Sequence, residues 1–478
     1  MRTYQLRARV YVLISLPLFA LPTPCYNRSM NATSRFWRAK LRPAAFWRLS
    51  VWLIAGIVLA GCQSSPELNV LNYRLARTLG VYDAPPADAP TGAISGLVLD
   101  NTQPIEGAVV VAAEPRGTVH AGRTDAAGRY RIDGLPPGRY VPAAVAPGYG
   151  EAVLWDEAGH PVTLAVLADA VVEAPPLQLR ERSIPPLPED LAEAVQLTQT
   201  GSYTATTVFP PDAAAQVLSY EFSYDGATVD TLRVYLPLDM APDAQLPLLF
   251  FSYPGDVDGW QDVSVGFASQ GYALAALSPI GARGLDVNAH AADARVALQL
   301  AQEGALTPHV DAAAPTIALG GSFTSAILYR LLLADPERLA AWVTLGGIAD
   351  AFGVAEGFYA GEIELPPAYA LVIPGLGQPN LAPLELLRYS PVYSAGDLPP
   401  TQIIHTAADR ILPIEQAFEL AEALQAAGVT VETFYYDDVS HYLQVGEALT
   451  PEGEEMFGRV LEFIERYQLP VDPGVESE

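Results

Sequence analysis

The chain has 478 residues, half of them apolar, and it carries 27 basic and 54 acidic residues, a formal net charge of −27. This length predicts two domains with at least one large core, and the negative charge argues against nucleic acid and anionic lipid surfaces as partners. Lys40 is the only lysine and the six histidines show no metal-ligand spacing, so we expect neither lysine-based chemistry nor a metal or other cofactor.

Residues 1–61 contain nine Arg or Lys and no Asp or Glu, and they end in the apolar run VWLIAGIVLAG. This pattern is typical of a bacterial export signal, and a start at Met30 would give a basic region of conventional length. The segment at 59–62, Leu-Ala-Gly-Cys, resembles a lipobox, which implies lipid attachment to Cys62. A plain transmembrane anchor is the alternative, although the run is shorter than the ~20 apolar residues that span a bilayer. Both interpretations place the rest of the chain in the cell envelope, on the extracytoplasmic side.

Residues 62–91 are predicted as the lipidated cysteine and a flexible tether, because DAPPADAPTG favours extended conformations. Short β-type runs separated by turns then follow over 92–180, which predicts a β-sandwich. Through TDAAGRY at 124–130 and LPPGRY at 135–140, this stretch resembles the carboxypeptidase regulatory-like family, a transthyretin-like sandwich. The resemblance implies a spacer or binding role without catalytic residues, and a solubilising stalk is the alternative.

A proline-rich linker is predicted over 181–200, and strand and helix signals alternate over 201–470 before a tail at 471–478. Continuous apolar runs such as LPLLFFSY, GYALAALSP and TIALGG are typical of strands that are buried on both faces of a mostly parallel sheet. The predicted fold class is therefore α/β, a mostly parallel sheet with helices on both sides, preceded by the small all-β sandwich.

Ser322 is the candidate nucleophile. The sequence Gly-Gly-Ser-Phe-Thr at 320–324 follows a predicted strand and precedes a predicted helix, as in the sharp turn that exposes the nucleophile of α/β-hydrolases. Thr324 stands where glycine is usual, and its branched side chain could crowd the turn. A Gly-Gly-Ser after a strand can also be an ordinary turn.

Asp409 and His441 are the candidate acid and base, in the chain order that this fold uses. Asp409 follows the strand QIIHT, where Thr406 replaces a customary glycine, and it could instead only cap the next helix. His441 follows the strand TVETFYYDD. In such a triad the histidine removes the serine proton and the aspartate orients the imidazole. The alternative for His441 is an ordinary packed or surface histidine.

The expected oxyanion hole includes the amide of Phe323, directly after the nucleophile. The second donor should follow LPLLFFSY, where related enzymes carry His-Gly and this chain has Tyr-Pro-Gly at 253–255. Because proline has no N–H, we expect the Gly255 amide, with the Tyr253 hydroxyl as another candidate.

Over residues 200–470 the chain resembles α/β-hydrolases of the dienelactone-hydrolase and prolyl-oligopeptidase-like groups. The motifs GGSFTSAILYRLLLADPERLAAWVTLGG and YSPVYSAGDLPPTQIIHTAADRILPIEQA carry most of this resemblance. It implies an acyl-serine hydrolase without a cofactor that acts on small esters or peptides.

An insert at about 349–389 is predicted to cover the pocket as a lid. Trp260, Phe323, Phe358 and Tyr359 are candidate pocket walls, with ordinary core as the alternative.

The leading hypothesis is an exported carboxylesterase. A peptidase with the same triad is the second hypothesis, and a binding protein on a degenerate hydrolase scaffold is the third. The sequence predicts no oligomeric state.

Overall fold

The computed structural model describes residues 66–207, 212–363, 365, 373–437, 441, 444–445, 448–449 and 451–468. The predicted export signal at 1–61, Cys62 and the predicted tail at 471–478 lie outside these residues. Contacts group Gln63–Glu478 as one unit, separate from Met1–Cys62. Within the described part of the chain, no helix is long and apolar enough to cross a bilayer.

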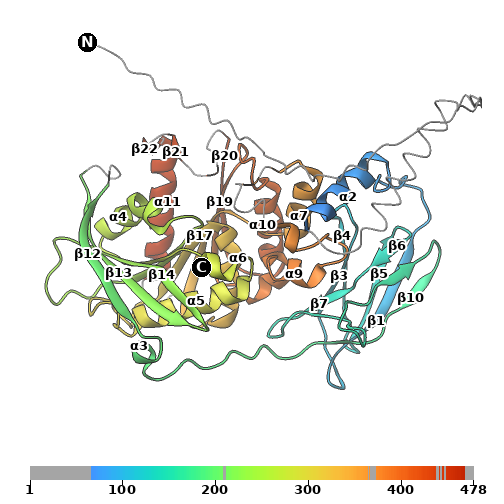
Figure 1. Ribbon diagram of the computed structural model, residues 1–478, viewed down its shortest axis with the longest axis horizontal. Helices are drawn as coiled ribbons and strands as arrows, with labels where there is room; N and C mark the ends of the chain where they lie inside the picture. The colour runs from blue at the N-terminus through green and yellow to red at the C-terminus, as the bar shows by residue number, and fades with distance from the viewer. Residues whose placement is uncertain are drawn as a thin grey trace, which may run out of the picture. The chain divides into compact units, whose positions relative to one another are not determined.

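The first domain is a β-sandwich, drawn in blue and turquoise in Figure 1. Its strands are β1 (Gly92–Asp100), β2 (Gln103–Pro104), β3 (Val109–Ala113), β4 (Val119–Arg123), β5 (Arg129–Leu135), β6 (Gly138–Tyr140), β7 (Ala143–Val145), β8 (Ala152–Val153), β9 (Leu164–Val166), β10 (Val171–Glu173) and β11 (Leu177–Gln178). Strand β1 pairs with β2, β5, β10 and β11, and a second sheet has the order β4-β3-β7-β8. The β-sandwich predicted for 92–180 is therefore present.

Strand β3 is buried on both faces, which explains why its sequence, VVVAA, lacks the usual alternation with polar residues. Val110 and Ala112 pack into the sandwich core. Val109, Val111 and Ala113 point the other way and belong to a core cluster shared with the second domain. The sandwich is therefore packed against the second domain and is not a free-standing stalk. Its role, as a spacer, a binding domain or a solubilising domain, stays a prediction.

The second domain contains a sheet whose strands are β12 (Thr198–Thr206), β13 (Ala214–Tyr224), β14 (Ala227–Pro237), β15 (Leu248–Ser252), β16 (Ala273–Leu277), β17 (Thr316–Ser322), β18 (Leu339–Gly347), β19 (Thr401–Thr406) and β20 (Val431–Tyr436). Within the described residues their order is β12-β13-β14-β16-β15-β17-β18-β19-β20. The pairs from β12 through β14 to β16 are antiparallel and all later pairs are parallel. In this mostly parallel sheet β16 lies between β14 and β15, so the spatial order of β15 and β16 is the reverse of their chain order. The second domain has the α/β-hydrolase fold.

Helices cover both faces of this sheet (Figure 1). They are α4 (Gln261–Ser269), α5 (Val287–Gln302), α6 (Phe323–Ala334), α10 (Glu415–Ala426) and α11 (Pro451–Gln468), with the short α3 (Leu191–Ala194) before the sheet. Apolar residues of α4 and α11 pack on one face, and those of α5, α6 and α10 pack on the other. Successive strand residues such as Phe250 and Phe251 fall into the two different cores, as expected for strands buried on both sides. A hairpin of β21 (Gln444–Val445) and β22 (Ala448–Leu449) precedes α11.

The segment predicted as a flexible tether differs from the prediction. Helix α2 (Pro66–Thr78) lies within it, and the side chain of Tyr73 is fully buried. The prolines and glycine that suggested a tether stand only in the later part, after Tyr82. The linker predicted for 181–200 is also shorter, because Leu191 and Val195 belong to the large core and β12 begins at Thr198.

The insert predicted for 349–389 contains α7 (Ala351–Ala360), a 3₁₀ turn (Ile373–Gly375) and α9 (Pro383–Leu387). Helix α7 contacts α2, and α9 contacts β3, β7 and β8 of the sandwich. Residues 364 and 366–372 of the predicted lid lie outside the described part. The described helices therefore form the surface on which the first domain and α2 rest.

Candidate active site

Ser322 stands on a strained turn between β17 and α6. Its φ of 51° and ψ of −135° are rare for a residue with a side chain. A Cβ atom on Gly320 would collide with the carbonyl oxygen of Ser252, and one on Gly321 would collide with that of Leu345. Two glycines are therefore required before the serine, because the chain passes this close to both neighbouring strands.

Thr324 is accommodated in this turn, although its side chain raised the expectation of crowding. It is completely buried, and its Oγ1 lies 2.6 Å from the Ser252 carbonyl oxygen and 2.8 Å from that of Gly321. The hydroxyl proton thus has carbonyl acceptors on both sides of the turn. Ser322 keeps its left-handed conformation, so the branched residue has not displaced the elbow.

The structure brings the three predicted residues together at the carboxyl edge of the sheet. His441 Nε2 lies 3.1 Å from Ser322 Oγ, and His441 Nδ1 lies 2.6 Å from Asp409 Oδ2. Because an ionised carboxylate only accepts hydrogen bonds, the ring proton is on Nδ1, which donates a hydrogen bond to Asp409. This leaves Nε2 as the acceptor for the serine hydroxyl, which is the arrangement that a general base requires.

Asp409 is held as a charged acceptor. Its Oδ1 accepts hydrogen bonds from the amides of Ile411 at 2.8 Å and Leu412 at 2.9 Å. Burial raises the pKa of Asp409, but the hydrogen bond and charge of His441 and the two amides outweigh burial, so that its pKa lies below the ordinary value. The helix-capping alternative is compatible with the amide bonds but leaves the contact with His441 unexplained.

Gly346, near the end of β18, completes the space around the acid and the base. Its φ is +54°, and a Cβ atom there would lie 3.4 Å from both Asp409 Oδ2 and His441 Nδ1. A side chain would be strained and would press on the hydrogen-bonded pair. Gly346 was not predicted, although a pair of glycines at the end of a buried strand is the signal that could have identified it.

The candidate oxyanion residues lie on the two segments that flank the nucleophile. Phe323 begins α6, and Tyr253 and Gly255 follow β15, the strand next to β17. Gly255 has a φ of +101°, which favours glycine. The indole N–H of Trp260 donates to the Pro254 carbonyl oxygen at 3.0 Å, and its ring lies 4.1 Å from that of Tyr253. Trp260 thus braces the loop that contains the expected second donor.

The four aromatic residues predicted as pocket walls divide into two groups. Phe323 and Trp260 lie on the segments just described, and the Phe323 ring contacts Tyr389 at 6.1 Å between centroids. Phe358 and Tyr359 instead form a separate apolar cluster with Tyr73 of α2. The alternative of ordinary core applies to this second pair, because their rings are covered by the segment that had been predicted as a tether.

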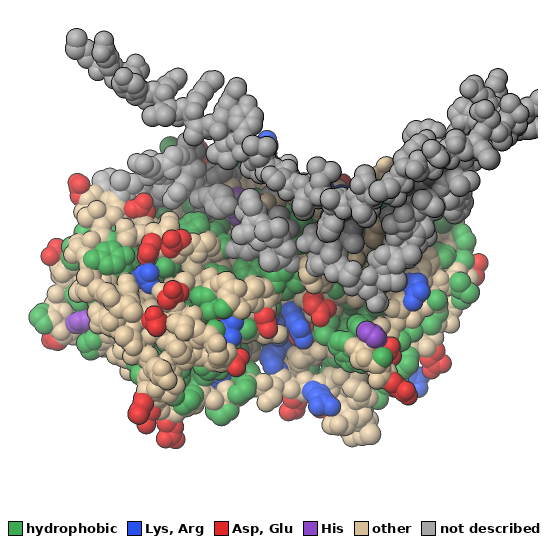
Figure 2. Space-filling view, in the orientation of Figure 1, with side chains coloured by type: hydrophobic (Ala, Val, Ile, Leu, Met, Phe, Trp, Pro, Cys, Tyr) green, Lys and Arg blue, Asp and Glu red, His purple; other side chains and the backbone are tan. Residues whose placement is uncertain are grey.

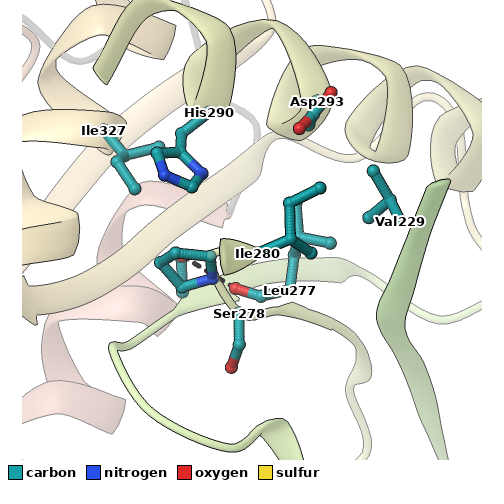
Figure 3. Close-up of a pocket in the computed structure, with 9 residues that line it drawn as sticks. Val229, Leu277, Ser278, Ile280, His290, Asp293 and Ile327 are labelled. Atoms are coloured by element: carbon teal, nitrogen blue, oxygen red, sulfur yellow. Dashed lines mark hydrogen bonds between the residues drawn. The ribbon is translucent and has the colours of Figure 1, made fainter. Parts of the chain in front are cut away.

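Two further polar residues support the elbow from behind. Ser325 Oγ donates to the Ser322 carbonyl oxygen at 2.6 Å and accepts from the Ile348 amide at 2.7 Å. His290 of α5 lies 3.1 Å from the Gly284 carbonyl through Nε2, and burial lowers its pKa. Figure 3 shows His290 and Ile327 on one side of a cavity of about 10 Å³, with Ser278 on the other. Ser325 thus bonds to the turn directly, and the His290 ring lies 5.8 Å from the ring of Phe323, the residue after Ser322.

Among the residues that the structure describes, no group of three or more His, Cys, Asp or Glu side chains could hold a metal ion. The candidate site itself brings together a hydroxyl, an imidazole, a carboxylate and backbone amides. Such a set can transfer an acyl group by nucleophilic attack with proton transfer.

One family model matches part of the first domain. Residues 93–173 match the model of the carboxypeptidase regulatory-like domain. The match confirms the resemblance found in the TDAAGRY and LPPGRY turns. No curated protein matches the chain.

Solved structures resemble the chain at low identity. A candidate dipeptidyl aminopeptidase IV from Bacteroides ovatus is 16% identical with a TM-score of 0.39, over 73% of this chain and 43% of that one. The acylaminoacyl peptidase of Pyrococcus horikoshii is 13% identical with a TM-score of 0.41, over 77% and 56%. An esterase of the Planctomycetes species Thermogutta terrifontis is 19% identical with a TM-score of 0.37, over 50% and 91%.

The chain thus spans less than two thirds of the length of either peptidase. Because all three TM-scores are below 0.5, the function proposed below depends on the geometry of the site alone.

Proposed function

We propose that this protein is a serine hydrolase that cleaves carboxylic esters through an acyl-enzyme on Ser322. The observation that carries the proposal is the continuous contact from Ser322 Oγ through the His441 ring to Asp409, with distances of 3.1 and 2.6 Å. The strained φ of Ser322 supports it, since such strain at a buried strand end is costly and concentrates at functional positions.

In the proposed reaction, Ser322 Oγ attacks the ester carbonyl carbon while its proton passes to His441 Nε2. The negative charge on the carbonyl oxygen is met by backbone amides, for which Phe323 and Gly255 are the proposed donors, with the Tyr253 hydroxyl as an alternative. The bond to the alcohol then breaks, and His441 returns the proton to the leaving oxygen. Water repeats the sequence on the acyl group, which releases the carboxylic acid and restores Ser322.

Asp409 is proposed to hold the His441 tautomer and to stabilise the imidazolium that forms in each half-reaction. Its depressed pKa supports this role, since a carboxylate that stays charged can stabilise the cation. Thr324, Thr406 and the missing His-Gly had together motivated the alternative of a degenerate binding scaffold. The accommodation of Thr324 by two carbonyl acceptors removes one of these three grounds and favours an active enzyme.

We also propose that the protein is exported and attached to a membrane by lipid on Cys62. The basic, acid-free residues 1–61 and the lipobox-like segment at 59–62 support this localisation. Ester and peptide substrates both remain compatible with the triad. The apolar, aromatic character of Phe323 and Trp260 favours an apolar acyl group on an ester.

The test is labelling with a fluorophosphonate, which reacts with activated serines, followed by turnover of a p-nitrophenyl ester and an aminoacyl anilide. We expect labelling and ester turnover in the wild type and in the control Ser202→Ala, which removes an exposed serine of β12. Ser322→Ala should lose both while its circular dichroism is unchanged. Labelling that persists in Ser322→Ala would contradict the proposal, and faster turnover of the anilide would assign the site to a peptidase.

A further inference from the structure

Helix α2 is fixed to the second domain by one of its faces. Tyr73 is fully buried, and its hydroxyl lies 3.0 Å from Glu356 Oε1 of α7 and 2.9 Å from the Pro115 carbonyl oxygen of the sandwich. Arg74 donates to the Tyr359 carbonyl oxygen at 3.0 Å, and Arg77 pairs with Glu356 at 2.8 Å. These contacts prevent the helix from rotating about its axis.

The opposite face of α2 is apolar and exposed. Leu71 and Leu75 lie one turn apart in α2, and Leu79 follows just beyond its last residue, Thr78; the exposed fractions of the three are 58%, 38% and 71%. The Leu79 amide donates to the Leu75 carbonyl oxygen at 3.0 Å, so the helical spacing continues to Leu79. Side chains four residues apart lie on the same side of a helix. These three leucines are here called the apolar stripe, and Val81, two residues further on, is 65% exposed.

The apolar stripe begins close to Cys62 along the chain. Pro66, the first residue of α2, is four residues after Cys62. Since a residue spans at most about 3.6 Å, a chain of four residues reaches no further than about 14 Å. A lipid on Cys62 would therefore keep the first turn of α2 within about 14 Å of the bilayer surface.

We infer that the apolar stripe of α2 rests on the surface of the lipid bilayer, so that Cys62 and α2 together orient the protein. This inference rests on the proposed lipid attachment. Single exposed leucines are common on soluble proteins, but here three leucines at helical spacing share one side of a helix whose other side is fixed by its contacts. An amphipathic helix that lies in the interface buries its apolar face to a depth of about 5–10 Å.

The charge of the protein favours an apolar contact over an electrostatic one. Outside residues 1–61 the chain has 18 basic and 54 acidic residues, and Figure 2 shows acidic side chains spread over the described surface. The two arginines of α2 are engaged by Tyr359, Glu356 and Glu362. Anionic headgroups would be repelled, so burial of leucine side chains is the interaction that α2 can offer to a membrane.

The chain allows a direct test of this contact. The only other cysteine, Cys25, lies in the predicted export signal, and lipid attachment would consume the thiol of Cys62. The substitution Leu75→Cys in the full chain would then supply a unique thiol for an environment-sensitive fluorophore. The labelled protein is reconstituted into phosphatidylcholine vesicles whose acyl chains carry bromine, a quencher. Leu238→Cys is the matched control, because Leu238 is 45% exposed and follows β14, at the sheet edge opposite to Ser322.

We expect at least twofold quenching and a blue-shifted emission for Leu75→Cys, and no change for Leu238→Cys. Protein that floats with the vesicles but shows no quenching at Leu75→Cys would overturn the inference while the anchor stands. Protein that does not float would contradict both. Disulfide-linked dimers of Leu75→Cys on vesicles would overturn it in favour of a second copy of the chain. Unchanged ester turnover in both variants would show that the proposed activity is unaffected by any of these results.

Discussion

Thr324 Oγ1 lies 2.6 Å from the carbonyl oxygen of Ser252. Thr324, two residues after the nucleophile, is thereby joined to the last residue of the neighbouring strand β15. Ser252 is followed directly by Tyr253, Pro254 and Gly255, the segment proposed to supply the second oxyanion donor. The position of that segment relative to Ser322 therefore depends on a hydroxyl that the glycine usual at this place does not have.

Replacing Thr324 with valine should test this connection. Thr324→Val keeps the shape but removes the hydroxyl, which leaves buried carbonyls without their side-chain donor and should lower the free energy of unfolding by about 1–3 kcal/mol. We also expect a lower kcat, because the oxyanion segment loses a restraint. Thr324→Ser should retain most of both quantities. Urea unfolding and ester kinetics measure them, and a valine variant that matches the wild type in both would rule out the connection.

Asp409→Asn should separate catalysis from folding. The asparagine oxygen can still accept from the amides of Ile411 and Leu412, so the turn should remain intact. Because the amide cannot enforce the His441 tautomer, kcat should fall by about 10⁴-fold. Asp156→Asn is the control, since Asp156 makes similar amide bonds to Ala158 and His160 in the sandwich. Equal kcat values for the two variants would exclude the proposed role of Asp409.

Asp350 should make stability depend on pH. It caps the N-terminus of α7, accepts from the Phe352 amide at 2.9 Å and from the Tyr393 hydroxyl at 3.1 Å, and burial raises its pKa to about 6. Because the folded-state pKa lies above the unfolded value near 4, its contribution is full below about pH 4 and is lost as the pH rises through about 6. The free energy of unfolding should fall by roughly 1–3 kcal/mol over this pH range.

The variant Asp350→Asn isolates this effect, because asparagine also caps helices well. Its free energy of unfolding should change less between pH 4 and 8 than that of the wild type, and it should exceed the wild-type value at pH 8. Urea titrations at pH 4, 6 and 8 measure both quantities. Parallel pH profiles for the two proteins would mean that Asp350 does not titrate in this range.

Glu151 and Arg330 should hold the sandwich to the second domain. Their side chains are only 4% and 11% exposed, and they form an ion pair between the domains. Burial raises the pKa of Glu151, but the charge and hydrogen bond of Arg330 outweigh it, so the pKa lies below the ordinary value. Glu151→Ala leaves the buried guanidinium of Arg330 without its ionic partner. The free energy of unfolding should fall by about 3–5 kcal/mol.

The control for this pair is Asp133→Ala, whose ion pair with Arg131 is exposed by 66% and 51%. Asp133→Ala should lower the free energy of unfolding by no more than about 1 kcal/mol, measured by urea titration as for Glu151→Ala. Glu151→Ala at the same low cost would indicate that the shared apolar core, rather than the ion pair, joins the domains.

The sequence predicted the elements that are buried on both faces. The runs LPLLFFSY, GYALAALSP and TIALGG became β15, β16 and β17, because a strand covered on two sides excludes polar residues almost completely. Strands β12 and β13 were not predicted. They form the antiparallel side of the sheet, where half-exposed residues weaken the apolar signal.

The order Ser322, Asp409, His441 could also be read from the sequence, because each residue follows a strand whose pattern is visible locally. Parallel strands bring their carboxyl ends to one edge, so the prediction that these residues meet depended only on the type of sheet. The sequence by itself therefore determined the fold class, the regulatory-like domain and the candidate triad residues.

Only the tertiary structure decided how the segments outside that pattern pack. The role of Thr324 depends on a carbonyl group 72 positions earlier in the chain, and the Tyr73 hydroxyl donates to Glu356, 283 positions later. The outer face of β3 is covered by another domain. These contacts join residues that are distant in sequence, and local patterns do not contain them, because hydrogen bonds and apolar burial depend on what the folded chain brings alongside.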